Sequence, residues 1–306
     1  MISNGPQVSI GLPVFNGENY LAEALDSILA QTFLDFELII SDNASTDRTQ
    51  KICETYAAKD DRIRYYRSPK NLGMAWNFNH AFELSVGEYF KWSAHDDLLA
   101  PNFLAKCVVI LDQDPSVVLC YPKARIIDEQ GHPLEDYNVK LNTDSPRPQD
   151  RFGDLLLAGH RCFEIFGVIR ASALRMTPLL GSYGHTDGVL LARLGFLGRF
   201  YEVPEHLFFP RKHLEQSMEK YMKKRVGNVP DYREYEKPIG QLNKFPHWTI
   251  LREYNNTIWQ APLSWPERIR CYFYFYKWIR RFRHLLTQDF VVVAKQALVR
   301  SSINFN

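Results

Sequence analysis

Short apolar runs alternate with helical patterns along the first 130 residues. The run at 7–16, QVSIGLPVFN, is rich in β-forming residues, and the stretch at 19–31 that follows carries leucine and isoleucine at helical spacing. The same order returns three times up to residue 115, and one further apolar run follows at 116–131. Parallel strands need crossover connections, and helices make these compactly. The alternation therefore predicts an α/β fold with a mainly parallel, Rossmann-like sheet that has helices on both faces.

The regular pattern weakens after residue 130 and then returns. Residues 131–160 contain prolines and many polar side chains, so we expect a long excursion outside the core. Periodicity resumes at 161–175 and again at 188–203, where apolar side chains are frequent. The second half should therefore add further elements to the same sheet.

The segment 266–284 predicts an amphipathic helix in a C-terminal helical extension. Its apolar face consists of Ile269, Tyr272, Phe273, Tyr276 and Ile279. Its basic face consists of Arg270, Lys277, Arg281 and His284. Two interpretations stay open. The helix docks on the body of the protein with its charges in solvent, or it is a surface helix that contacts anionic lipid headgroups.

Composition narrows the class of protein. The 306 residues carry 37 basic and 35 acidic side chains, and no nucleic-acid-binding module is recognisable, so a nucleic-acid partner is not expected. The five cysteines are widely spaced without a CxxC pair, which indicates neither a disulfide framework nor a zinc site. The N-terminus has no basic region before an apolar core, and no stretch of 18 apolar residues occurs. We therefore expect a cytoplasmic protein without a membrane span.

Polar residues end several of the predicted strands, and in parallel sheets ligands bind beyond these carboxyl ends. The triplet His95, Asp96 and Asp97 directly follows the strand-like run at 88–94. Two neighbouring carboxylates in a loop need a balancing positive charge, which a hard divalent cation, Mg²⁺ or Mn²⁺, would supply through oxygen ligands. The alternative is a pair of solvated carboxylates near the start of the next helix, where negative charge suits the helix dipole.

Four short motifs occur in register with this alternation. They are PVFNGENYL, SDNASTD, NLG and the strand-terminal HDD. With these motifs in this order and spacing, the chain resembles the N-terminal half of a family 2 glycosyltransferase of the GT-A fold. The resemblance is strong over 7–130 and weaker over 160–215. It implies a GT-A catalytic domain at 1–225, with a nucleotide-sugar-binding half at 1–130 and an acceptor-binding half at 131–225. Residues 226–306 would form a basic and aromatic helical extension.

The resemblance also implies how the donor nucleotide binds. The loop with Pro13, Phe15 and Asn16 would form the base pocket together with Asp42, whose carboxylate would accept the imide N–H of uracil. This preference makes a UDP-sugar the first candidate donor. Purely structural roles, core filling for Phe15 and a turn for Asp42, stay open. Asn43 and Ser45 are interpreted as turn formers.

The turn at Asn71 and Gly73 resembles the family loop under the sugar-nucleotide, where glycine permits a close approach of the backbone. In the acid pair the resemblance assigns Asp97 to the metal, and Asp96 to the ribose hydroxyls or to an indirect role. His95 occupies the place of the first acid in the fuller DxD pattern. A turn-forming role for Gly73 is the structural alternative.

Two further segments complete the implied active site. Asp187, in HTDGVLLAR, matches the family's general base, although Thr186 or Asp187 could also cap the helix that follows. Arg211 or His213, in FFPRKHLEQSM, would neutralise the leaving diphosphate or add a nitrogen ligand to the metal, and Lys212 could serve equally well.

Together these features predict an inverting, metal-dependent glycosyltransferase that moves a sugar from a nucleoside diphosphate sugar to an acceptor hydroxyl. A saccharide or lipid-linked saccharide of surface polysaccharide or glycolipid assembly is the acceptor class, with peripheral contact at the inner face of the membrane through the C-terminal helix. The alternatives are a non-catalytic sugar- or nucleotide-binding module and a nucleotidyltransferase. A nicotinamide-dependent oxidoreductase is excluded, because the first βα turn lacks GxGxxG. The oligomeric state stays open.

Overall fold

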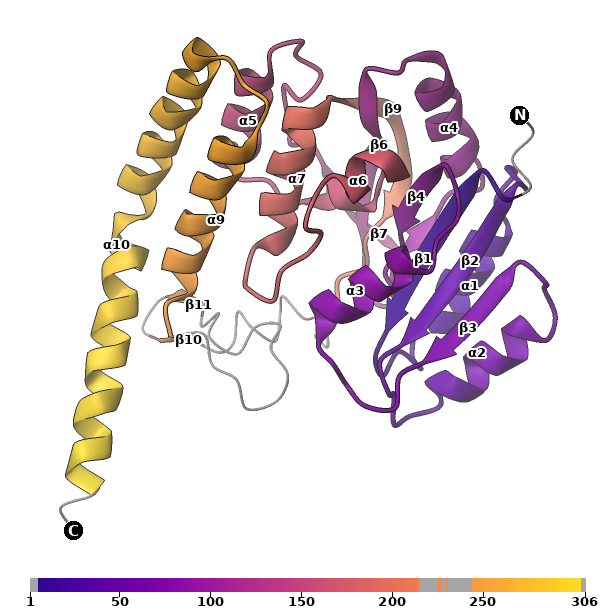
Figure 1. The fold of residues 1–306 in the computed structure, drawn as a ribbon. Helices are drawn as coiled ribbons and strands as arrows, with labels where there is room; N and C mark the ends of the chain where they lie inside the picture. The colour runs from indigo at the N-terminus through magenta and orange to yellow at the C-terminus, as the bar shows by residue number, and fades with distance from the viewer. Residues whose placement is uncertain (1–4, 215–224, 227–228, 231–243, 304–306) are drawn as a thin grey trace.

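A computed structural model describes residues 5–214, 225–226, 229–230 and 244–303, and every structural statement below refers to these residues. Their main feature is one mixed sheet with helices around it (Figure 1). Its strands are β1 (Val8–Val14), β2 (Phe36–Asp42), β3 (Ile63–Arg67), β4 (Tyr89–Trp92), β5 (Leu98–Leu99), β6 (Val117–Ile127), β7 (Pro133–Tyr137), β8 (Val168–Arg170) and β9 (Arg199–Phe209).

The strand order is β3-β2-β1-β4-β8-β6-β9-β5, with β7 paired to β6. The strands β3, β2, β1 and β4 are mutually parallel, and β6 is parallel to β9. Antiparallel β8 joins the two parallel groups, and β5 and β7 are antiparallel to their neighbours. The mainly parallel sheet predicted from the alternation is confirmed. Each residue of β1 and of β2 is buried, as expected for central strands covered on both faces.

The helices divide between the two faces of the sheet. One apolar cluster joins the sheet to α1 (Leu21–Leu29), α2 (Thr49–Ala57) and α4 (Phe103–Gln113). A second cluster joins the opposite face to α3 (Met74–Glu83), α5 (Pro148–Leu157), α6 (Ala171–Arg175) and α7 (Thr186–Leu197). The sheet thus presents the carboxyl ends of β1, β2 and β4 along one edge, and the loops that follow them carry the predicted donor-binding residues.

The expected excursion at 131–160 was wrong. β7 pairs with β6 there, and α5 buries Phe152 and Leu155 in the core. The polar composition suggested an exposed segment. Arg151 is nevertheless buried, because its guanidinium donates hydrogen bonds to the backbone carbonyls of Gly195 and Ser145. Pro148 begins the helix, a position where proline costs nothing because the first N–H groups of a helix have no partner within it.

The C-terminal extension consists of α9 (Pro246–Gln260) and α10 (Trp265–Ile303), which lie beside α5 and α7 (Figure 1). The C-terminal helix therefore docks on the body of the protein, but the predicted docking face is only partly right, since Tyr272 and Ile279 pack against this core. Cys271, Phe275 and Trp278 are buried against α9 and α5, whereas Ile269 and Phe273 of the predicted apolar face are exposed. The pattern misled because aromatic residues occur all around this helix.

A third apolar cluster joins α9 and α10 to α5 and α7, so the extension shares a core with the body of the protein. The predicted boundary between residues 225 and 226 falls in the short strand β10 (Arg225–Val226), which pairs with β11 (Val229–Pro230). The flanking residues 215–224 and 231–243 lie outside the described part of the chain. Among the described residues, no helix combines the length and apolarity needed to cross a membrane.

Candidate functional site

The loop after β1 is built on the end of β2. Asn16 has a left-handed backbone (φ 53°), and its N–H donates to Ser45 Oγ at 2.9 Å, while its side-chain oxygen accepts the N–H of Thr46 at 2.8 Å. Pro13 is buried within β1. Phe15 remains 43% exposed, so its ring is not a core filler. The loop therefore presents an aromatic surface at the sheet edge, which suits stacking on a base.

Asp42 lies beneath this loop and is fully buried. One of its carboxylate oxygens accepts the N–H of Ser45 at 2.8 Å, and the other accepts the Tyr65 hydroxyl at 2.8 Å and lies 3.3 Å from Arg67 Nε. Burial, together with the hydrogen bond to Asp42, raises the pKa of Tyr65, so the phenol stays protonated as the donor. The carboxylate thus fixes the turn that supports the predicted base pocket.

Asn43 connects this edge to the loop before α3. Its amide nitrogen donates to Asn71 Oδ1 and to the Gly73 carbonyl, both at 3.0 Å, and its side-chain oxygen accepts the N–H of Leu72 at 2.8 Å. Gly73 has φ 93°, a conformation that favours glycine. Asn43 was expected only to form a turn, but it also links two loops. The sequence did not show this role, because the partners of Asn43 lie about 30 positions away.

The two acids after β4 are both buried and have different partners. Asp96 Oδ2 lies 2.8 Å from His213 Nε2, and Asp97 Oδ1 accepts the backbone N–H of Arg211 at 2.9 Å. Burial and the neighbouring Asp96 raise the pKa of Asp97 well above its ordinary value. Burial opposes ionisation of Asp96 as well, but the His213 hydrogen bond and nearby histidine charges outweigh it and lower the Asp96 pKa.

Arg211 lies on the interior side of the acid pair. Its guanidinium donates to the carbonyls of Asp96 and Glu129 and to Glu23 Oε2, and it stacks on the Tyr20 ring. Its side chain is fully buried, so it braces the acid loop from behind. The neighbouring Lys212 is exposed.

Asp97 and His213 offer a carboxylate oxygen and a ring nitrogen that a hard divalent cation could use, although their ligand atoms and those of Asp96 do not all lie within 4.8 Å of one another. His213 Nδ1 is buried and has no hydrogen-bond partner among the described residues, while Nε2 is oriented by Asp96. A carboxylate that orients an imidazole is the usual outer partner of a histidine ligand. The raised pKa of Asp97 means that the pocket favours a positive charge, a proton or a cation, at that carboxylate.

These groups meet at one edge of the sheet. A side chain at Gly17 would collide with the His95 ring at 2.6 Å, so the loop after β1 touches the acid motif directly. Tyr20 packs on His213 with ring centroids 4.6 Å apart, which brings the segment after β9 to the same place. The predicted donor-side residues therefore lie around a common edge, as parallel strand ends require.

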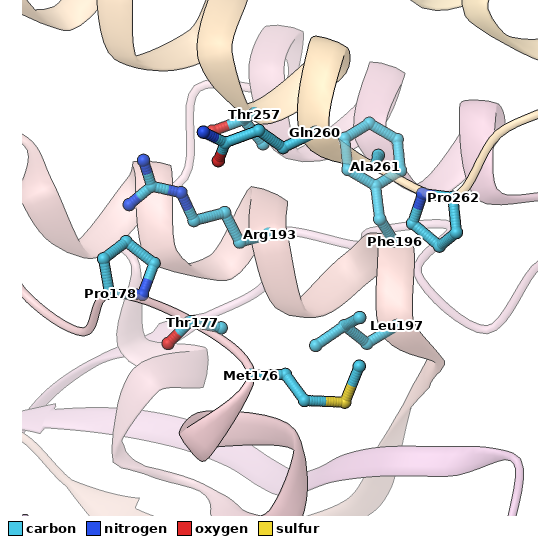
Figure 2. Close-up of a pocket in the computed structure, with 10 residues that line it drawn as sticks. All are labelled: Met176, Thr177, Pro178, Arg193, Phe196, Leu197, Thr257, Gln260, Ala261 and Pro262. Atoms are coloured by element: carbon cyan, nitrogen blue, oxygen red, sulfur yellow. The ribbon is translucent and has the colours of Figure 1, made fainter.

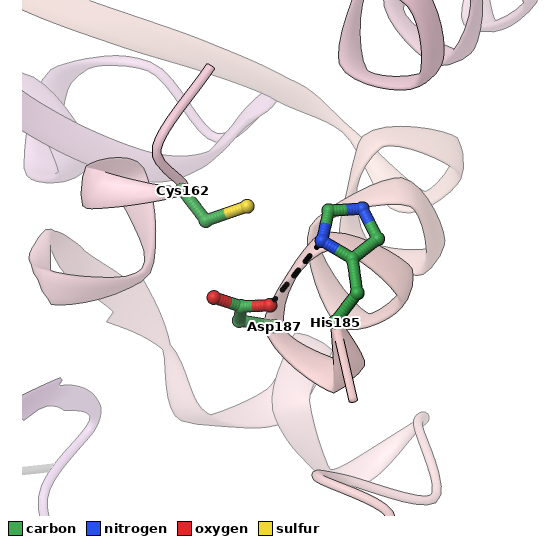
Figure 3. Close-up of side chains that lie close together, drawn as sticks. All are labelled: Cys162, His185 and Asp187. Carbon is green, nitrogen blue, oxygen red and sulfur yellow. Dashed lines mark ion pairs between the residues drawn. The ribbon is translucent and has the colours of Figure 1, made fainter. Parts of the chain in front are cut away.

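Asp187 lies in the first turn of α7 with its side chain 39% exposed. The capping position is His185, which has φ 61° and makes no side-chain cap hydrogen bond. His185 Nδ1 lies 3.8 Å from Asp187 Oδ1, and buried Cys162 lies close to both (Figure 3). The Asp187 carboxylate is partly exposed to solvent, and its Oδ1 accepts the backbone N–H of Gly188 at 2.8 Å, so it also supports the first turn of α7 as the capping alternative expected.

Comparison with known proteins identifies the family. Residues 9–175, more than half of the chain, match the model of glycosyl transferase family 2. The chain belongs to this family. An uncharacterised glycosyltransferase of Rickettsia typhi is 40% identical over 136 residues, which cover 44% of this chain and 41% of that relative. The chain therefore spans less than half the length of this relative.

Solved structures of glycosyltransferases share the fold of this family 2 chain. TarS of S. aureus, solved with UDP-GlcNAc, has a TM-score of 0.69 at 16% identity and covers 90% of this chain and 73% of its own. The mannosyltransferase PcManGT of Pyrobaculum calidifontis, solved with GDP-Man and Mn²⁺, has a TM-score of 0.56 at 16% identity. The match covers 99% of this chain and 81% of the PcManGT chain. The predicted GT-A type α/β fold is confirmed.

One cavity of the family 2 chain lies apart from the strand-end site. It has a volume of about 80 Å³ and opens between the segment after α6, the last turns of α7 and the end of α9 (Figure 2). Its lining consists of Met176, Thr177, Pro178, Arg193, Phe196, Leu197, Thr257, Gln260, Ala261 and Pro262. None of the predicted site residues contributes to it, so we do not assign the donor to this cavity.

Proposed function

We propose that this family 2 protein is an inverting glycosyltransferase that uses a nucleoside diphosphate sugar, with a UDP-sugar as the first candidate. The observation that carries the proposal is the buried Asp96, Asp97 and His213 group, placed beside the loop after β1 at the carboxyl ends of the strands. The UDP-GlcNAc bound to TarS and the GDP-Man bound to PcManGT support a nucleotide-sugar donor.

The donor is held by the loops at the sheet edge. Phe15 stacks on the base, and Asp42 and Asn16 fix the turn against which the base lies, with the Asp42 carboxylate as the acceptor for the imide N–H. Asn43 sets the position of Asn71 and Gly73 under the sugar-nucleotide. Pro13 fixes the exit of β1. Since Tyr65 and Ser45 already bond to Asp42, donor binding requires a small rearrangement at that carboxylate.

Asp97 and His213 Nδ1 hold the divalent cation, Mn²⁺ or Mg²⁺, and Asp96 orients the imidazole. When bound, the cation stabilises the negative charge that develops on the leaving diphosphate. The buried position of Arg211 favours a positioning role for this residue, behind the acid loop, over direct contact with the diphosphate. Exposed Lys212 is the cationic side chain of this segment that can reach the phosphates.

Asp187 accepts the proton of the acceptor hydroxyl as that oxygen attacks the anomeric carbon, so the sugar transfers in one displacement with inversion. The acceptor is a saccharide or lipid-linked saccharide of surface polysaccharide or glycolipid assembly, bound by the half of the domain at 131–225. The extension from 226 to 306 attaches the protein to the inner face of the membrane. Exposed apolar and basic side chains along α10 support this attachment.

The test compares two variants with the unmodified protein. Asp187→Asn should bind a UDP-sugar with Mn²⁺ as well as the unmodified protein does, but lose at least about 100-fold in transfer rate, the usual contribution of a general base. Asp97→Asn should lose the cation-dependent part of donor binding. Donor affinity is measured by calorimetry, and transfer or donor hydrolysis by release of UDP.

Unchanged turnover in Asp97→Asn would contradict the cation assignment, and a parallel loss of binding and turnover in Asp187→Asn would indicate a structural role for that carboxylate. Donor binding without any transfer or hydrolysis by the unmodified protein would favour a non-catalytic binding module.

A further inference from the structure

A second group of ligand-type side chains lies away from the Asp96 and Asp97 pair. Cys162 Sγ, a ring nitrogen of His185 and a carboxylate oxygen of Asp187 lie within 4.8 Å of one another (Figure 3). They come from the 3-10 turn before β8 and from the start of α7. Thiolate, imidazole and carboxylate together form a ligand set typical of zinc, whereas Mg²⁺ and Mn²⁺ prefer oxygen.

We propose that Cys162, His185 and Asp187 bind a thiophilic divalent cation such as Zn²⁺, and that this cation inhibits glycosyl transfer by occupying the Asp187 carboxylate. The site is separate from the oxygen-rich donor cation site. The inhibitory consequence, but not the binding, rests on the proposed role of Asp187 as the general base.

The distances are close to those that a tetrahedral ion needs. Zinc bond lengths of about 2.0–2.3 Å place neighbouring ligand atoms about 3.3–3.8 Å apart. His185 Nδ1 and Asp187 Oδ1 already lie 3.8 Å apart, and no pair in the group exceeds 4.8 Å. Rotation of side chains alone can close the remaining gap of about 1 Å. The partial exposure of His185 and Asp187 leaves one side open for a fourth ligand such as water.

Tyr254 supplies the outer support that such a histidine requires. Its hydroxyl, buried on α9, lies 2.9 Å from His185 Nε2, which is the ring nitrogen that does not face Asp187. With Nδ1 on the cation, Nε2–H donates to the Tyr254 oxygen and fixes the ring. The nearby His160 is not a ligand, because both of its ring nitrogens are engaged, by Glu164 and by the Leu155 carbonyl.

The backbone holds two of the three ligands in a costly conformation. Cys162 has φ 57° and His185 has φ 61°, which lie in the left-handed region that is unfavourable for residues other than glycine. Strain of this kind persists where the surrounding structure requires a particular direction for a side chain, often at a functional site. Here it directs two ligand side chains from separate segments toward the same carboxylate.

Binding of the cation has a balanced proton count. Burial and the Asp187 charge raise the pKa of Cys162 well above its ordinary value, so the thiol is protonated before the cation arrives. The S–H bond breaks, the sulfur lone pair forms the bond to Zn²⁺, and one proton leaves to solvent. No electron is transferred.

The direct test uses Co²⁺ as a spectroscopic substitute for Zn²⁺, on the full chain with Mg²⁺ present to saturate the donor cation site. We expect one Co²⁺ per chain, with the thiolate-to-Co²⁺ charge-transfer band in the near ultraviolet. Cys162→Ser should abolish the band, and His185→Asn, which keeps a residue tolerant of the left-handed backbone, should weaken binding at least about 10-fold. Cys53→Ser, at a buried cysteine on α2, is the matched control and should keep the band.

Inhibition by Zn²⁺ is then measured for each variant relative to its own zinc-free rate. The unmodified protein and Cys53→Ser should lose transfer at Zn²⁺ concentrations that fill the site, whereas Cys162→Ser should not. The absence of a thiolate band in the unmodified protein, or its survival in Cys162→Ser, would overturn the site. Zinc binding without inhibition would support the zinc site but contradict both its inhibitory role and the role of Asp187 as the base. Failure of the zinc site and failure of the proposed function therefore give different results.

Discussion

At the scale of single residues, Lys91 on β4 makes a pH-dependent contribution to stability. It is fully buried, its ammonium donates to the carbonyls of Trp92 and Phe166, and desolvation lowers its pKa to about 7. The unfolded chain has the ordinary value of 10.5, so between these two pH values unfolding takes up a proton. The free energy of unfolding should therefore rise as the pH increases from 7 toward 10.

Lys91→Met should remove this rise, and the exposed Lys59→Met should retain it. Urea unfolding at pH 7, 8.5 and 10 measures the difference, whose upper limit follows from about 1.4 kcal/mol per unit of pKa shift. Identical pH dependence in the unmodified protein and in Lys91→Met would contradict a depressed pKa at this position.

Single residues also mark the limit of the sequence analysis. Asp96, Asp97 and His213 could be chosen in advance because strand ends and motifs locate them, and the structure places His213 in contact with Asp96, next to Asp97. Cys162 and His185 could not, since a thiol and an imidazole more than 20 positions apart have no ligand spacing in the sequence. Two left-handed backbone conformations bring them together, and only the structure reveals these.

At the scale of elements, α10 caps α9. The Asp289 carboxylate accepts the backbone N–H groups of His247 and Trp248, the first turn of α9, and also lies 2.8 Å from His247 Nδ1. Asp289→Ala would remove the carboxylate that accepts both N–H groups, which should cost about 1–3 kcal/mol of unfolding free energy. Urea unfolding and faster amide exchange at 247–250 measure the effect. The exposed Asp61→Ala is the control, and an equal change in both variants would contradict the cap.

The sequence predicts an element correctly where its buried positions are mostly apolar. β1 and β2 are continuous apolar runs because the sheet is covered on both faces, and α1 has a clean apolar stripe. α5 was missed because buried Arg151 replaces an apolar side chain. The docking face of α10 was only partly predicted, because the helix carries aromatic side chains on both its packed and its exposed sides.

At the scale of the whole molecule, the helices of the extension leave an apolar surface uncovered. We call the group Trp259, Trp265, Ile269, Phe273 and Tyr276 the aromatic face; each side chain is more than half exposed. Exposed basic side chains border it on α10, and Lys277 lies 4.5 Å from the centre of the Phe273 ring. Aromatic and basic side chains together suit the interface of an anionic bilayer, where rings lie among the headgroups and cations meet phosphate.

This face gives the proposed membrane attachment a quantitative test. The protein should sediment with vesicles that contain phosphatidylglycerol and far less with vesicles of phosphatidylcholine alone. Each basic side chain near an anionic surface contributes about 1 kcal/mol, so replacing Arg270, Lys277 and Arg281 by glutamine should weaken binding about 100-fold. Phe273→Ser should weaken it further through lost apolar contact, whereas Leu34→Ser, at an exposed apolar residue outside the extension, should have no effect. If the unmodified protein fails to sediment with the anionic vesicles, the extension does not bind membranes.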